Sequence, residues 1–164
     1  MFVGREDSLA VVRDAVANRR PIVLVGEAGV GKTTLVREAV AGSPSTSSHP
    51  RRQGGGRGVS RTAATRRVFE GGALGVLTWR EYLALERALG RPVNGIDPAA
   101  VAADVQDTVR DGVLVLEDLQ WAAPSTTQVL EALAGRVGLV ATVRSGDPGA
   151  ASVLEILGAA GFAE

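Results

Sequence analysis

The sequence predicts one α/β domain over residues 1–164, with a parallel sheet covered by helices on both faces. Its expected strands at 21–25 and 112–116 are apolar throughout instead of alternating, which is typical of strands buried on both sides. Segments with helical spacing of apolar residues separate these strands, and such alternation favours parallel pairing. A length of 164 residues with 45% hydrophobic composition suffices for one such core but not for two.

The expected elements follow from apolar spacing and from the residues that begin and end each segment. Leu9, Val12 and Val16 recur at helical intervals before the first strand. Asp97 precedes Pro98 and is expected to cap the helix that begins there. Strands are expected at 21–25, at 67–70 with two glycines after it, at 112–116 and at 137–143. Helices are expected at 5–18, 34–41, 79–90, from 98 onward, at 124–134 and at 149–160.

A glycine-rich octet lies between the first strand and the helix that follows it. Residues 26–33 read GEAGVGKT and fit G-x-x-x-x-G-K-[ST] in the strand–loop–helix context of a phosphate site. Glycine permits positive φ and lets backbone N–H groups approach an anion, while the helix N-terminus attracts negative charge. Lys32 is expected to reach the β- and γ-phosphates, and Thr33 to hold Mg²⁺. The expected nucleotide contacts are Gly26, Glu27, Ala28, Gly29, Val30, Gly31, Lys32, Thr33 and Thr34.

Two acids, Glu117 and Asp118, follow the apolar strand near residue 116. Acids at the carboxyl end of a buried parallel strand, downstream of a phosphate loop, match the Walker B element. One carboxylate can hold Mg²⁺ and another can orient the attacking water. Position assigns the metal to Glu117 and catalysis to Asp118. The longer side chain of Glu117 leaves metal binding by Asp118 as the alternative.

A further candidate follows the strand at 137–143. Ligands of doubly wound sheets bind outside the carboxyl ends of strands, so Arg144 or Thr142 is expected to sense the γ-phosphate. A surface arginine without a role is the alternative. Trp121, shortly after the acids, is expected to pack under the loop rather than to contact a ligand.

Composition argues against several other classes of function. A net charge of zero provides no global attraction to nucleic acid or membrane. The chain has no cysteine and a single histidine, His49, so disulfides, thiolate metal sites and histidine-based catalysis are not expected. Without a leader peptide or a long apolar run, a cytoplasmic protein without membrane contact is expected. Neither a helix-turn-helix nor aromatics interleaved with basic residues occur, so direct DNA binding is not expected.

One segment, 43–66, differs in composition from both of its flanks. It is rich in serine, glycine and arginine, and Val59 is its only large apolar residue. Such a segment cannot offset its ordering entropy, so a disordered insertion is expected. A basic arm that contacts phosphates and a misread stretch of the gene are the alternatives.

Three stretches together resemble the AAA-like ATPase module of STAND NTPases, in particular that of large LuxR-type ATP-binding transcriptional regulators. They are FVGRE at 2–6, GEAGVGKTTL at 26–35 and LVLEDLQWAAPST at 114–126. The resemblance covers residues 1–41 and about 67–160, and Arg144 fits the family's strand-end arginine. It implies ATP and Mg²⁺ as ligands, a nucleotide switch with slow hydrolysis, and Val3 and Gly4 as contacts of the adenine.

The sequence departs from that family in two respects. Glu117 stands where members usually carry aspartate, which puts metal affinity and turnover in question. The chain is expected to be a three-layer P-loop NTPase core that is incomplete at its C-terminus, before the last core strand and the helical lid. Phe162 is expected near the start of that strand, and further domains of a longer regulator are expected partners. A nucleotide-binding module without turnover and a truncated, inactive gene product are the alternatives to an ATPase.

Overall fold

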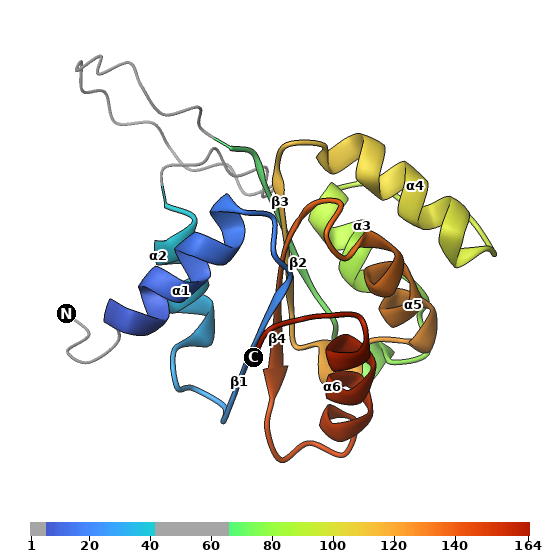
Figure 1. Ribbon diagram of the computed structural model, residues 1–164. Helices are drawn as coiled ribbons and strands as arrows, with labels where there is room; N and C mark the ends of the chain where they lie inside the picture. Colours follow the sequence, from blue (N-terminus) through green and yellow to red (C-terminus); the bar gives the residue numbers. More distant parts are fainter. Residues whose placement is uncertain (1–5, 42–65) are drawn as a thin grey trace, which may run out of the picture.

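The sheet of this computed structural model has its strands in the order β1–β4–β3–β2, and every neighbouring pair is parallel (Figure 1). Residues 6–41 and 66–164 are described. The strands are β1 (Ile22–Gly26), β2 (Val68–Gly72), β3 (Val113–Glu117) and β4 (Gly138–Arg144). The helices are α1 (Glu6–Ala17), α2 (Lys32–Ala39), α3 (Leu83–Leu89), α4 (Pro98–Val109), α5 (Pro124–Leu133) and α6 (Ala150–Ala159). Short 3₁₀ turns are η1 (Gly75–Leu77) and η2 (Leu119–Trp121).

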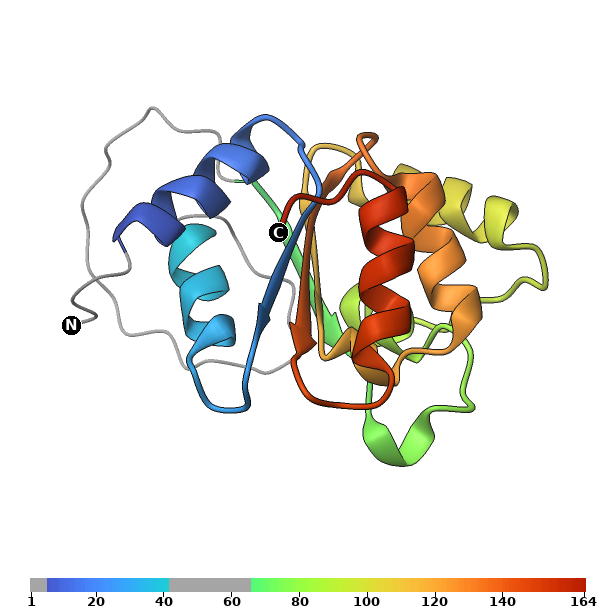
Figure 2. The same cartoon turned by 60° about the horizontal axis from the view of Figure 1, so that its bottom comes forward.

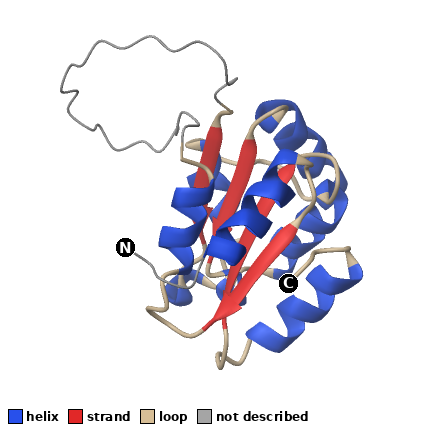
Figure 3. Ribbon diagram, turned by 60° about the vertical axis from the view of Figure 1, so that its left-hand side comes forward, coloured by secondary structure: helices blue, strands red, loops and turns tan. Residues whose placement is uncertain are grey.

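Helices cover both faces of the sheet, with α1 and α2 on one face and α3 to α6 on the other (Figures 1 and 3). The strands are mostly apolar because alternate side chains enter two different cores. In β3, Val113 and Val115 pack with Val12 of α1 and Val36 of α2. Leu114 and Leu116 point to the opposite core, which α3 to α6 complete. The predicted three-layer α/β architecture is therefore confirmed.

The strands and helices lie within two residues of the predicted bounds, except at the start of α3. A helix was expected from Trp79, but α3 begins at Leu83. Tyr82 has a φ of 56° and occupies the left-handed region, which interrupts helical hydrogen bonding at this point. Its ring is buried in the core, whereas Trp79 is 75% exposed. Burial of Tyr82 therefore accompanies the turn that delays the helix.

The predicted cap of α4 is confirmed. The Asp97 carboxylate accepts hydrogen bonds from the backbone N–H groups of Ala99 (3.1 Å) and Ala100 (3.3 Å). Gly71, the first of the two glycines that end β2, also has a packing role, because an added Cβ there would lie 2.2 Å from the carbonyl oxygen of Ala84. The backbone of α3 thus lies directly against β2.

The C-terminal residues lie beside β1, as Figures 1 and 2 show. Ala163 forms a parallel bridge with Ile22, and its carbonyl oxygen accepts from the N–H of Val23 at 2.8 Å. Phe162 is buried in the core immediately before this bridge. Its predicted approach to a further strand position next to β1 is therefore confirmed.

Part of the expected disordered insertion, like the first residues of the chain, lies outside the described residues, which omit 1–5 and 42–65. Arg66, the last residue of that predicted insertion, is described. Its guanidinium donates hydrogen bonds to the carbonyl oxygens of Val16 and Ala17 at the end of α1. Within the described ranges, no helix is long and apolar enough to span a bilayer.

Candidate functional site

Two glycines in the loop between β1 and α2 adopt left-handed backbone conformations. Gly29 and Gly31 have φ values of 77° and 88°, which only glycine adopts without strain. Gly31 is the N-cap of α2 and provides no side-chain cap. The first N–H groups of α2 are therefore directed at the loop, where a helix N-terminus favours an anion.

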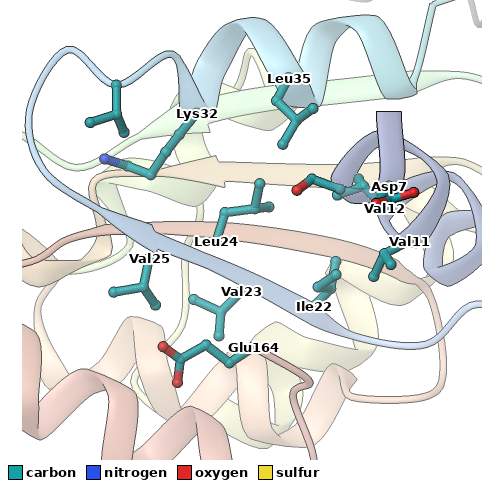
Figure 4. A pocket seen from close by; sticks show the side chains of 12 residues that line it. Asp7, Val11, Val12, Ile22, Val23, Leu24, Val25, Lys32, Leu35 and Glu164 are labelled. Carbon is teal, nitrogen blue, oxygen red and sulfur yellow. The ribbon is translucent and has the colours of Figure 1, made fainter. Parts of the chain in front are cut away.

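The side chain of Lys32 folds back over this loop. Its amine donates hydrogen bonds to the carbonyl oxygens of Gly26 (2.7 Å) and Glu27 (2.8 Å), and Figure 4 shows it turned toward the loop. Burial lowers the pKa of the Lys32 amine; the charge of Asp118 opposes this shift and that of Arg144 adds to it. The charges of both Asp118 and Arg144 therefore act on the loop lysine.

The lowered pKa of Lys32 predicts enhanced reactivity toward amine reagents. Because Lys32 is the only lysine in the chain, its peptide can be followed by mass spectrometry across a pH series. The neutral amine is the nucleophile, so a lower pKa should shift half-maximal modification to lower pH than in N-α-acetyl-lysine amide. The shift should disappear in denaturant. A midpoint at or above that of the reference amine would contradict the burial of this group.

The two acids at the carboxyl end of β3, Glu117 and Asp118, affect the pKa of different basic side chains. Asp118 has φ 55° and ψ 45°, so the chain turns immediately after Glu117. A hydrogen bond to Glu70 raises the pKa of Arg37 on α2, and the charge of Glu117 adds to this shift. The charge of Asp118 acts instead on Lys32. The charges of the two acids thus act on different basic side chains, that of Asp118 on the loop lysine and that of Glu117 on Arg37.

Arg144, at the carboxyl end of β4, lies between two carboxylates and an aromatic ring. Its guanidinium is 3.8 Å from Asp118 Oδ1 and 3.9 Å from Asp147 Oδ2. Its Cζ lies 4.8 Å from the centroid of the Trp121 ring, within the range of a cation–π contact. The buried Nε has no hydrogen-bond partner among the described residues. Charge and stacking thus hold Arg144 without a close hydrogen bond to either carboxylate.

Thr142 and Gln120 fix the backbone around these charged groups. The hydroxyl of Thr142 accepts a hydrogen bond from the Asp118 N–H at 3.1 Å, and its side chain is buried. Of the two candidates for sensing a ligand on β4, Arg144 is half-buried and therefore the more accessible one. Gln120 was not predicted; its side chain bonds both Asp118 and the backbone of Arg144. Trp121 packs against the core as expected, and it also stacks on Arg144.

The remaining predicted site residues are the threonines after Lys32, the two residues before α1 and the candidate Mg²⁺ ligands. Thr33 is half-buried in the first turn of α2 and Thr34 is exposed, while Val3 and Gly4 lie outside the described residues. Within the described ranges, no cluster of three or more His, Cys, Asp and Glu side chains forms. The hydroxyl and carboxylate oxygens of Thr33, Glu117 and Asp118 are nevertheless of the type that Mg²⁺ prefers, and Mg²⁺ needs only one or two carboxylates beside phosphate and water.

A hollow of about 440 Å³ lies along the open side of β1, next to the phosphate loop. Figure 4 shows it between the first turns of α1, strand β1 and the start of α2. Its wall is mostly apolar, with Asp7 and Ser8 as polar groups on α1 and Glu164 at the opposite side. The lining residues are Asp7, Ser8, Val11, Val12, Ile22, Val23, Leu24, Val25, Val30, Lys32, Leu35 and Glu164.

Comparison of the sequence with known protein families identifies the family of this chain. The family model of the AAA ATPase domain matches residues 1–145, which include the phosphate loop, both acids and Arg144. No curated protein matches the chain.

Proposed function

This chain belongs to the AAA ATPase domain family, and we propose that it binds ATP with Mg²⁺ and hydrolyses it slowly, as a nucleotide switch in a signalling or transcriptional regulator. The observation that carries the proposal is the convergence of three strand ends on one site. The guanidinium of Arg144 at the end of β4 lies 3.8 Å from the carboxylate of Asp118 after β3, and the charges of both act on the pKa of Lys32 in the loop after β1. Ligands of parallel α/β sheets bind at this edge.

Each residue has a proposed part in binding. The N–H groups at the start of α2 receive phosphate oxygens, and Lys32 exchanges its bonds to Gly26 and Glu27 for the β- and γ-phosphates. Thr33 with Glu117 or Asp118 would hold Mg²⁺, which neutralises phosphate charge when bound. Arg144 is proposed to contact the γ-phosphate, because its guanidinium has no close hydrogen bond to a carboxylate.

The adenine base of ATP is proposed to lie in the hollow beside β1. This hollow adjoins the phosphate loop at Val30 and Lys32, and it combines apolar walls with the polar groups of Asp7 and Ser8. Val3 and Gly4 precede α1 in the sequence and are proposed as further contacts of the adenine. The preference for ATP rests on the resemblance of residues 2–6 to the adenine-contacting segment of the family.

The regulatory setting rests on the resemblance of residues 114–126 to the large ATP-binding regulators. In that setting, further domains of a longer protein respond to whether ATP or ADP is bound. This domain itself is proposed to make no contact with DNA or membrane. The proposal places the domain in the cytoplasm, where ATP and Mg²⁺ are abundant.

Titration of the full chain with fluorescent ATP and GTP analogues tests the proposal. We expect saturable binding of the ATP analogue, weaker binding of the GTP analogue, and a marked loss of affinity when Mg²⁺ is chelated. Circular dichroism of the same samples establishes that the chain is folded. Absence of saturable binding by the folded chain would overturn the proposed function.

A further inference from the structure

Gln120 bridges the ends of two strands with the two ends of one carboxamide. Its Oε1 accepts a hydrogen bond from the backbone N–H of Arg144 at 2.9 Å. Its Nε2 donates to Oδ1 of Asp118 at 3.3 Å. Asp118, which follows β3, is therefore connected through a single side chain to Arg144 at the end of β4.

The position of Gln120 is tightly constrained. It lies within η2 and is only 6% exposed. The segment that leads from β4 into α6 presses against it, since an added Cβ at Gly149 would lie 2.2 Å from the Gln120 carbonyl oxygen. A buried amide with both ends hydrogen-bonded has little freedom to change its rotamer. A displacement at the end of β3 would therefore also displace the end of β4.

The guanidinium of Arg144, in contrast, is held only by longer contacts. Its distances to the carboxylates of Asp118 and Asp147 are 3.8 Å and 3.9 Å, and it stacks on Trp121. These contacts are worth less than direct charge-assisted hydrogen bonds, which a phosphate oxygen would offer. A γ-phosphate can thus compete for the side chain of Arg144 while Gln120 keeps its backbone in place.

We propose that Gln120 is a positioning residue that couples Asp118 to Arg144, so that a nucleoside triphosphate, and not a diphosphate, draws Arg144 away from Trp121. The inference rests on the proposed function and adds to it a residue that sets the discrimination between the two nucleotides. An amide is required because the position needs a donor toward Asp118 and an acceptor toward Arg144. Glutamate would retain the acceptor, lose the donor and repel Asp118.

Tryptophan fluorescence provides the test, because the chain has two tryptophans and the other, Trp79, is largely exposed. In a Trp79→Phe background, Trp121 reports alone on its contact with Arg144. We expect a nonhydrolysable triphosphate analogue with Mg²⁺ to change the Trp121 emission and ADP to leave it nearly unchanged. Gln120→Glu should abolish this difference and reduce the ratio of triphosphate to ADP affinity by at least about fivefold, the effect of one hydrogen bond.

Matched variants separate this role from a merely structural one. Gln128→Glu makes the same change at an exposed position of α5 and should leave both affinities within about twofold of the parent. Gln120→Met removes both hydrogen bonds without adding a charge and should also abolish the discrimination. A structural defect would instead lower the melting temperature and reduce the affinities for the triphosphate and for ADP by the same factor.

The outcomes distinguish this inference from the function on which it rests. Parent-like discrimination in both Gln120 variants would overturn the coupling and leave nucleotide binding intact. A Trp121 signal that is equal for triphosphate and diphosphate in the Trp79→Phe chain would overturn it as well. Absence of any nucleotide binding by the folded parent would overturn the proposed function and this inference together.

Discussion

Replacement of Lys32 by alanine should reduce the affinity of the chain for ATP by at least about a hundredfold. The amine would form charge-assisted hydrogen bonds with two phosphate groups, and each such bond contributes about 1.5–3 kcal/mol. Two of them correspond to at least about two orders of magnitude in the dissociation constant. Titration of the variant with the fluorescent ATP analogue in the presence of Mg²⁺ measures the loss.

The control for this substitution must separate a lost ligand contact from a disturbed loop, because Lys32 also bonds to Gly26 and Glu27. Arg13→Ala removes one positive charge from an exposed position of α1 and should change the affinity by no more than about threefold, as expected for a solvent-screened charge. Circular dichroism and melting temperatures should be similar for both variants. Parent-like ATP binding by a folded Lys32→Ala chain would show that the loop is not the phosphate site.

The architecture could be predicted because its strongest signals are local in sequence. Strand β3 is buried on both faces, so its valines and leucines form an uninterrupted apolar run. The glycine-rich octet marks both the end of β1 and the start of α2. The start of α3 was not predicted, because the left-handed backbone of Tyr82 depends on contacts between residues distant in the chain. Apolar periodicity alone continues the helix through that turn.

The candidate site was predictable to the same extent. Parallel strands end at one edge of a sheet, so the order of the motifs already brings Lys32, the acids and Arg144 together. One feature requires three-dimensional positions. The bridge made by Gln120 depends on the register of β3 beside β4, and no spacing rule in the sequence predicts it.

A second large effect is expected at Asp118, whose charge acts on Lys32. Asp118→Asn should lower ATP turnover by about two to four orders of magnitude, the usual contribution of a positioned general base, and should leave the dissociation constant of ATP within about threefold. Asparagine is nearly isosteric and tolerates the left-handed conformation that Asp118 adopts (φ 55°). Its carbonyl oxygen can still accept from Gln120. The variant therefore removes the charge near Lys32 without disturbing the backbone, and steady-state phosphate release measures the effect.

Glu117→Gln is the matched comparison, because it makes the same change in the adjacent residue, whose charge acts on Arg37 instead. If Glu117 holds the metal, this variant should need a higher Mg²⁺ concentration for half-maximal ATP binding and Asp118→Asn should not. The opposite pattern would exchange the two roles and assign the metal to Asp118. Unchanged turnover in both variants would contradict a catalytic acid after β3, because no water-orienting carboxylate could then reside there.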